Sequence, residues 1–298
     1  MAGSKGIGGS DAGAILGLDP YRSVFAVYCD KLGLLPEQPD NEAMRQGRDL
    51  ENYVALRFEE QTGLRVRRCG YMLQHPKISW ALANVDRLIV GKHAGLECKT
   101  TSVLTRTKYD RGDIPAQYYA QCMHYIAVTG LPVWYLAVLV LNKAFYVFTV
   151  ERDEAEVKSL LEAERDFWEG HVLPQVPPEP DGSAQAGKVI AQLHPAAEAG
   201  SDEPLALYEE SDRIARYLDL DGQIKQLTAV RDGIKQRLQL RLGDSLEGRT
   251  DRYVVRWPNA ASTRLDTRRL KAERPEIYKE YAKTVSYRKF EIKEIQAS

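Results

Sequence analysis

The spacing of apolar residues changes several times along the first 171 residues. Five stretches predict helices, and in those over 23–32 and 41–62 apolar side chains recur every three or four positions, as in helices with one buried face. The five stretches cover residues 12–16, 23–32, 41–62, 115–129 and 153–171. Shorter apolar runs predict strands over residues 65–73, on both sides of a turn within residues 80–100, and over 133–141 and 144–150. This order of elements predicts an α/β fold in which a mixed sheet is flanked by helices.

The pattern is different in the remainder of the chain. Residues 174–200 are rich in Pro, Ala and Gly, which predicts a linker between a domain over residues 1–173 and an extension over residues 201–298. In the extension, apolar residues at alternating spacings of three and four predict a long amphipathic helix, interrupted at Arg231; they are Leu220, Ile224, Leu227, Ile234 and Leu238. Such a helix packs on its own domain, the simpler interpretation, or on a partner. Strands over 253–257 and 286–292 and helices over 266–273 and 275–282 are also expected.

Composition indicates an ordinary globular protein of 298 residues, long enough to bury a full core. The longest apolar run, Val133–Leu141, has only the length of a strand, so we expect no membrane association. The N-terminus lacks a basic-then-apolar signal pattern, which favours the cytoplasm. The four cysteines form no C-x-x-C pair, which argues against zinc and iron–sulfur sites and favours reduced thiols.

Charge is distributed unevenly, although the net charge is only −1. Residues 61–112 hold ten Lys and Arg against three acids, and residues 248–298 hold thirteen against seven. Between them, residues 151–223 hold six Lys and Arg against eighteen acids, as on a solvated helix surface. The two basic segments are therefore candidates for a surface that follows a phosphate backbone.

The candidate chemistry lies in the hairpin within residues 80–100. We expect Asp86 in its first strand and Glu97 and Lys99 in its second, where a spacing of two puts both side chains on one face and Cys98 on the other. Two carboxylates can bind a hard cation such as Mg²⁺, and an ammonium group beside them can hold a water molecule or stabilise charge on a phosphate. This set suits a metal-dependent phosphodiester hydrolase. The spacing alone is equally compatible with a surface hairpin whose charged residues have no common function.

Further polar residues are candidates for the same site. Glu51 lies beside the apolar face of the helix over 41–62, so it is either a solvated charge or an acid that faces the site. Gln121 belongs to a polar stripe of the helix over 115–129, which suggests a cleft. A glycine run precedes Ser10, a plausible helix N-cap, and could cradle a phosphate. Candidate phosphate contacts among the basic residues are Arg65, Arg67, Arg106, Lys108 and Arg111.

Five segments of the chain together resemble a known family. They are Gly9–Gly17, Gln46–Glu51, Asn84–Leu88, Leu96–Thr100 and Tyr119–Tyr125. In this order, over residues 6–172, they are similar to the phage-type nucleases of the YqaJ and lambda exonuclease group, within the PD-(D/E)xK superfamily. Val85 replaces the proline that precedes the aspartate in the superfamily motif. The end of the chain, Ser286–Lys293, is similar to the tails of longer phage members.

The resemblance implies a fold and a set of residue roles. The fold would be a PD-(D/E)xK restriction-endonuclease-like core followed by a mainly helical extension. Asp86, Glu97 and the Cys98 carbonyl would bind Mg²⁺, with two ions in the site and Mn²⁺ as a substitute, and Glu51 would reach the ions directly or through water. Lys99 would orient the attacking water with support from Gln121. Ser10 would contact a phosphate of the DNA end.

The resemblance also implies an activity and partners. Members digest one strand of linear double-stranded DNA from 5′ to 3′, leave 5′-phosphate products, and hand the remaining strand to a single-strand annealing protein for recombination; some form homo-trimers around DNA. The expected setting is a phage or prophage protein in the cytoplasm of a bacterial host. Two alternatives stay open: an endonuclease on the same fold, and a non-catalytic DNA-binding scaffold. The complete set of acids with Lys99 argues against the scaffold.

Overall fold

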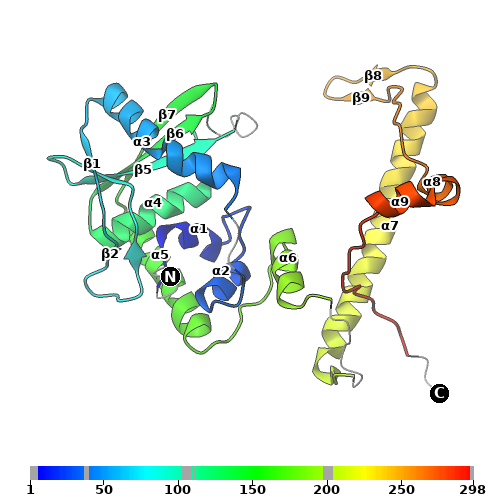
Figure 1. Cartoon of the computed structure of the whole chain (residues 1–298), viewed down its shortest axis with the longest axis horizontal. Helices are drawn as coiled ribbons and strands as arrows, with labels where there is room; N and C mark the ends of the chain where they lie inside the picture. Colours follow the sequence, from blue (N-terminus) through cyan, green and yellow to red (C-terminus); the bar gives the residue numbers. More distant parts are fainter. Residues whose placement is uncertain (1–5, 37–39, 103–108, 110–111, 197–203, 296–298) are drawn as a thin grey trace. The chain divides into compact units, whose positions relative to one another are not determined.

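A mixed β-sheet forms the centre of the N-terminal unit in the computed structural model of the chain (Figure 1). The structure describes residues 6–36, 40–102, 109, 112–196 and 204–295. The chain divides into two compact units, Met1–Pro195 and Ala196–Ser298. In the described part of the chain, no helix is both long and apolar enough to cross a membrane.

The sheet has five strands among the described residues, in the order β1-β4-β5-β6-β7. Their bounds are β1 Val66–Arg68, β4 Arg87–Ile89, β5 Ala94–Thr101, β6 Val133–Val140 and β7 Ala144–Glu151. Only β5 and β6 pair in parallel; the other neighbours are antiparallel. The parallel pair requires a crossover, which helix α4, Ala116–Thr129, supplies. The predicted mixed sheet flanked by helices is therefore confirmed.

Helices cover both faces of this sheet because β6 is apolar on both sides. Trp134, Leu136 and Val138 pack into one core with α4 and α5, Glu154–Phe167, whereas Ala137 packs into a second core with Phe58 of α3, Glu42–Thr62. This alternation follows the two-residue period of a strand. The first core also takes in α1, Gly9–Ile15, and α2, Val24–Lys31.

Two helix ends follow from local chemistry, and a third differs from expectation. The Asn41 side chain accepts a hydrogen bond from the Met44 N–H at the start of α3, as its N-cap position predicts. Gly63 ends that helix with a positive φ of 72°, which favours glycine. Ser10 is not an N-cap, because α1 begins one residue earlier, after Gly8.

Several predicted strand boundaries are wrong. The strand expected over 65–73 divides into β1 and β2, Leu73–Gln74, and β2 pairs with β3, Leu82–Ala83, outside the main sheet. The first hairpin strand divides likewise into β3 and β4, so Asp86 lies immediately before β4 rather than within a strand. The alternation of apolar and polar residues cannot reveal where a strand is interrupted. Both parts of the strand keep the two-residue period, whichever strand each of them pairs with.

The range expected as a linker contains a helix. Helix α6, Ala184–Leu193, is capped by the Ser183 hydroxyl and buries Ala186 and Val189, the latter in the core that contains α2. A five-residue π-helix, Trp168–Val172, extends α5 toward it and buries Trp168 and Val172. Most of the predicted linker therefore belongs to the N-terminal unit, which ends at Pro195.

The C-terminal unit consists of one long helix, short helices and a hairpin. The described elements are a 3₁₀ turn Tyr208–Glu210, α7 Ser211–Leu242, β8 Glu247–Arg249, β9 Val254–Arg256, α8 Thr267–Glu273 and α9 Pro275–Tyr281. The predicted amphipathic helix is thus present as α7, and none of its residues, all described, is buried. Residues 286–292, also described, form no strand and are mostly exposed.

Candidate active site

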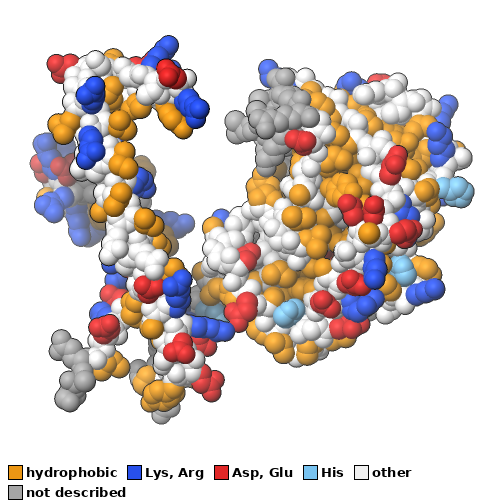
Figure 2. Space-filling model, turned by 180° about the vertical axis from the view of Figure 1, so that it is seen from behind, with side chains coloured by type: hydrophobic (Ala, Val, Ile, Leu, Met, Phe, Trp, Pro, Cys, Tyr) orange, Lys and Arg blue, Asp and Glu red, His pale blue; other side chains and the backbone are white. Residues whose placement is uncertain are grey.

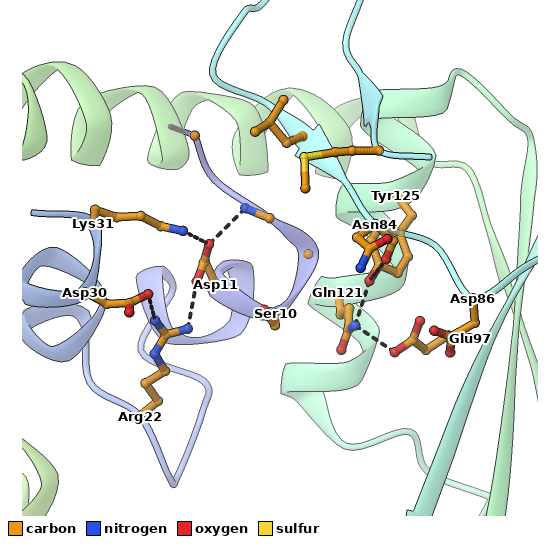
Figure 3. A pocket seen from close by; sticks show the side chains of 15 residues that line it. Ser10, Asp11, Arg22, Asp30, Lys31, Asn84, Asp86, Glu97, Gln121 and Tyr125 are labelled. Atoms are coloured by element: carbon orange, nitrogen blue, oxygen red, sulfur yellow. Dashed lines mark hydrogen bonds and ion pairs between the residues drawn. The ribbon is translucent and has the colours of Figure 1, made fainter. Parts of the chain in front are cut away.

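The register of β4 against β5 places the two predicted carboxylates together. Arg87 pairs with Leu96, so the next pair outward is Asp86 opposite Glu97. The Asp86 Oδ2 atom accepts a hydrogen bond from the Cys98 N–H at 2.8 Å, which anchors the aspartate beside the strand. Figure 3 shows the two carboxylates side by side at one end of a pocket.

Lys99 and Gln121 both contact the Glu97 carboxylate. The Lys99 Nζ atom lies 2.6 Å from Glu97 Oε1 and 5.1 Å from the centre of the Tyr118 ring. Burial lowers the pKa of Lys99, but the charge of Glu97 outweighs burial and raises the pKa above its ordinary value. Lys99 is therefore a fixed positive charge. Gln121 Nε2 donates to the same Glu97 oxygen at 2.7 Å and lies 2.9 Å from the Tyr125 hydroxyl, which donates to the Asn84 carbonyl at 3.1 Å.

The remaining atoms of the carboxylate pair have the chemistry of a cation site. Glu97 Oε2 is buried and has no hydrogen-bond partner among the residues that the structure describes. Burial, followed by the charge of Glu97, raises the pKa of Asp86 to about 8, although the Cys98 N–H opposes this rise. Two carboxylates that destabilise each other's charge beside an unpartnered oxygen fit a hard divalent cation, which would supply the missing positive charge.

Glu51 reaches this site through Arg87. Its carboxylate pairs with the buried Arg87 guanidinium, which also donates to the Asp86 carbonyl at 2.8 Å. The Glu51 charge further raises the pKa of Asp86, so the two groups interact. Within the described ranges, however, no three His, Cys, Asp or Glu side chains gather as a metal-binding group. The structure therefore brings Asp86, Glu97, Lys99 and Gln121 together. Glu51 contacts this group only indirectly, through Arg87.

Cys98 contributes its backbone and not its thiol. Its side chain packs in the second core, on the face opposite Glu97 and Lys99, as the two-residue period predicts. Burial and the neighbouring Asp86 and Glu97 charges raise the pKa of the thiol, so it stays protonated.

The pocket extends from the carboxylates to a second polar cluster (Figure 3). It has a volume of about 440 Å³, and Ser10 lies between the two clusters. In the second cluster, Asp11 pairs with Lys31 at 2.6 Å and with Arg22 at 2.7 Å, and Arg22 also pairs with Asp30 at 2.8 Å. Burial raises the pKa of Asp11, but the two cations outweigh burial and lower the pKa, so the group is ionised.

The sequence analysis does not include the residues of this second cluster. Asp11 is adjacent to Ser10 in a segment that carries the family resemblance, which is the one signal that could have indicated it. Arg22 and Lys31 lie in no recognised motif and reach the pocket only because α2 packs beside α1. Asn84 and Tyr125 join the lining through the Gln121 hydrogen bonds described above.

The glycine run at the start of α1 has a packing role. A Cβ atom on Gly9 would lie 2.5 Å from the Tyr125 ring, and one on Gly13 would lie 2.9 Å from the Gln117 backbone. These glycines let α1 approach α4 closely enough to form the pocket between them. The hypothesis of a phosphate cradle stays a prediction.

Three of the six predicted DNA contacts lie among the described residues. Ser10 lines the pocket, whereas Arg65 and Arg67 are exposed at the edge strand β1, outside the pocket lining. Arg106, Lys108 and Arg111 lie outside the described residues. Among the candidates that the structure describes, Ser10 therefore lines the pocket and the two arginines do not.

Comparisons with known proteins place the chain in a family. Residues 2–132 match the YqaJ-like viral recombinase domain. The chain is 36% identical over 296 residues to the uncharacterized protein YqaJ of Bacillus subtilis (strain 168), an alignment that covers 98% of this chain and 92% of that protein.

Solved structures show where the fold recurs. The alkaline exonuclease LHK-Exo of Laribacter hongkongensis is similar with a TM-score of 0.50 and 19% identity, and its complex with dAMP with 0.51 and 20%; each match covers 59% of this chain and 91% of that one. At this identity the likeness establishes a shared fold for the N-terminal unit. Taken with the end-to-end match to YqaJ, it leads to one conclusion: this chain belongs to the YqaJ family of viral recombinase-like proteins.

Proposed function

We propose that this protein is a Mg²⁺-dependent exonuclease that digests one strand of linear double-stranded DNA from 5′ to 3′ and leaves 5′-phosphate products. The observation that carries the proposal is the Asp86–Glu97 pair, which lines a pocket beside Lys99 and in which one buried Glu97 oxygen has no hydrogen-bond partner among the described residues. The shared fold with an alkaline exonuclease supports the same reaction class.

Each residue of the candidate site would have its own role in the hydrolysis. Asp86 and Glu97, with the Cys98 carbonyl and Glu51 as further ligands, would hold one or two Mg²⁺ or Mn²⁺ ions, which activate water and neutralise charge on the scissile phosphate when bound. Lys99 orients the attacking water and stabilises negative charge as it grows on the phosphate. Gln121 keeps Glu97 in place through its hydrogen bond to Oε1.

The second cluster would recognise the strand end. The Arg22 guanidinium lines the pocket while paired with Asp11 and Asp30, and Ser10 lies between this cluster and the Asp86–Glu97 pair. A terminal phosphate accepts hydrogen bonds from both kinds of group. LHK-Exo, which shares the fold, has been crystallised with dAMP, a nucleoside monophosphate with the chemistry of a released product.

Membership of the family supports a proposal for the biological setting. A recombinase-like exonuclease would expose single strands and pass them to a single-strand annealing protein. The protein would form a homo-trimer around the DNA. It would originate from a phage or prophage and act in the bacterial cytoplasm.

The experiment is a digestion of end-labelled linear duplexes, with and without a 5′-phosphate, beside a covalently closed circle. We expect Mg²⁺-dependent loss of the 5′-labelled strand, faster with the phosphate, and an intact circle. EDTA should stop the reaction, and Mg²⁺ or Mn²⁺ should restore it. Cleavage of the circle would instead identify an endonuclease, and no cleavage of any substrate would identify a non-catalytic scaffold.

A further inference from the structure

The C-terminal unit has a basic surface that the proposed nuclease site does not use. Residues 248–298 hold thirteen Lys and Arg against seven acids, an excess of six positive charges in a chain with net charge −1. Figure 2 shows Lys and Arg side chains interspersed with hydrophobic ones on this unit. A mixture of this kind suits a ligand with both charged and flat apolar parts.

Aromatic side chains of the same segment are exposed. Tyr253 and Trp257, which flank β9, are 70% and 47% exposed, and both lie on the β8–β9 hairpin or directly after it. Beyond the hairpin, Tyr281, Tyr287 and Phe290 are each about three-quarters exposed. Five exposed rings in fewer than forty residues leave a large apolar area uncovered, which marks a binding surface.

Several arginines of the same basic segment are uncompensated. Arg252, Arg264, Arg268 and Arg288 form no ion pair with any residue in the described ranges. Other cations of the same segment do pair with acids, as Arg256 does with Glu247 at 2.7 Å. An uncompensated guanidinium is free to neutralise a phosphate group.

We propose that the C-terminal unit binds single-stranded DNA through the exposed rings and arginines of the β8–β9 hairpin, α8, α9 and residues 282–295. Exposed rings stack on nucleotide bases, and uncompensated cations contact the phosphates between them. A duplex does not offer this contact, because its bases stack on one another. The inference rests on the proposed function in one respect, the origin of the single-stranded DNA. When one strand of a duplex is digested, the other strand remains near the enzyme as single-stranded DNA.

Binding is measured on the full chain in EDTA, so that catalysis is absent. The probes are a fluorescent oligo(dT) strand and a blunt duplex of equal length. We expect the strand to bind more tightly than the duplex, and the Tyr253→Ala/Trp257→Ala variant to bind the strand at least about tenfold more weakly. The control is Tyr208→Ala, which removes an even more exposed ring (87%) next to Glu209 and Glu210 and should bind as the wild type does. Unchanged binding by the double variant, or a preference for the duplex, would overturn the proposal.

Tryptophan fluorescence gives a second readout. Trp80, Trp134 and Trp168 are buried, so quenching by a stacked base would come from Trp257. We expect oligo(dT) to quench the wild type but not Trp257→Phe, which keeps a ring able to stack and should bind within about threefold. Equal quenching in both proteins would contradict the proposed contact.

Salt dependence tests the cations. Replacing Arg252 and Arg268 by Ala should lower the slope of log K against log salt by about 0.7 for each lost phosphate contact, and an unchanged slope would refute their role. None of these measurements requires cleavage. A chain that binds single strands but digests no DNA would refute the proposed function and leave this inference standing.

Discussion

Glu97 is the side chain on which the candidate site converges. Lys99 and Gln121 share its Oε1 atom, while Oε2 lies buried without a hydrogen-bond partner in the part of the chain that the structure describes. A buried carboxylate oxygen without a partner is unfavourable in the folded state, so it marks the atom best placed to receive a further ligand. Asp86 beside it, with a pKa raised to about 8, indicates the same need for positive charge.

Replacing Lys99 separates catalysis from folding. Lys99→Ala should lower the rate of DNA cleavage by at least about 100-fold, because it removes a positive charge where negative charge grows. The matched control is Lys92→Ala in the turn between β4 and β5, an exposed lysine whose loss should leave the rate unchanged. Rates are measured at saturating Mg²⁺ with circular dichroism as the check on folding. Full activity of Lys99→Ala would contradict the assigned role.

A buried histidine connects helix α4, which carries Gln121, to helix α5. His124 of α4 is fully buried, with Nδ1 2.7 Å from Glu164 Oε1 of α5 and Nε2 2.8 Å from the Leu82 carbonyl oxygen. Burial lowers the pKa of His124, but the charge and hydrogen bond of Glu164 outweigh it, and the net effect raises the pKa. The protonated histidine therefore belongs to the folded state.

This pair predicts a pH dependence of stability. A histidine whose pKa is higher in the folded state stabilises the fold fully below its unfolded value of about 6.5, and this contribution is lost as pH rises through the folded value. Relative to Glu164→Gln, the wild type should therefore lose free energy of unfolding as the pH rises above about 6.5 in urea titrations. Glu162→Gln, an exposed acid on the same helix, should follow the wild type. Parallel curves for wild type and Glu164→Gln would exclude this linkage.

At the scale of elements, the pocket depends on how closely α1 approaches α4. Gly9 and Gly13 permit this approach, because a Cβ atom at either position would overlap Tyr125 or the Gln117 backbone. Tyr125 in turn holds Gln121, which holds Glu97. The small side chains of α1 thus determine the position of a polar network on another helix.

Gly9→Ala tests this packing. The added methyl group should displace the Tyr125 ring and lower the free energy of unfolding by roughly 1–3 kcal/mol, with a loss of cleavage activity. Gly187→Ala is the matched control, because a Cβ atom there meets nothing within 4 Å on helix α6. Removing a glycine at such a site should stabilise the fold by roughly 0.5–1 kcal/mol. Equal effects of both substitutions in chemical denaturation would show that α1 does not need its glycine.

At the scale of the molecule, the two units divide the proposed tasks. Every residue that lines the pocket lies between Gly6 and Tyr125, and α6 belongs to the same unit. The hydrophobic cores described above also lie wholly within this unit. The described lining of the candidate site therefore includes no residue of the C-terminal unit.

A chain that ends at Pro195 should fold and cleave. We expect a cooperative thermal transition and a rate on short duplexes within about threefold of the full chain, because the core and pocket are complete. A chain that ends at Leu173, the boundary expected from composition, should be less stable because it lacks the buried side chains of α6. If both truncated chains unfold at the same temperature, α6 does not contribute to the unit.

Much of the fold is readable from local signals. The helical spacing of residues 41–62, the Asn41 cap and the alternation across residues 133–150 identify elements that the structure contains at nearly the same bounds. Errors occur where pairing partners change, as at residues 65–73, and where composition hides a helix, as in α6. In both cases contacts distant in sequence outweigh local preference.

The sequence by itself determined which residue types stand two positions apart on β5 and which segments match the family, because strand period and motif order are properties of the chain. Only the tertiary structure decided that Glu51 meets Arg87, that Glu97 keeps an unpartnered oxygen, and that Arg22 reaches the same pocket. Arg22, Asp86 and Gln121 line one pocket because of sheet register and helix packing. Those arrangements are set by burial summed over the core, and no local spacing encodes them.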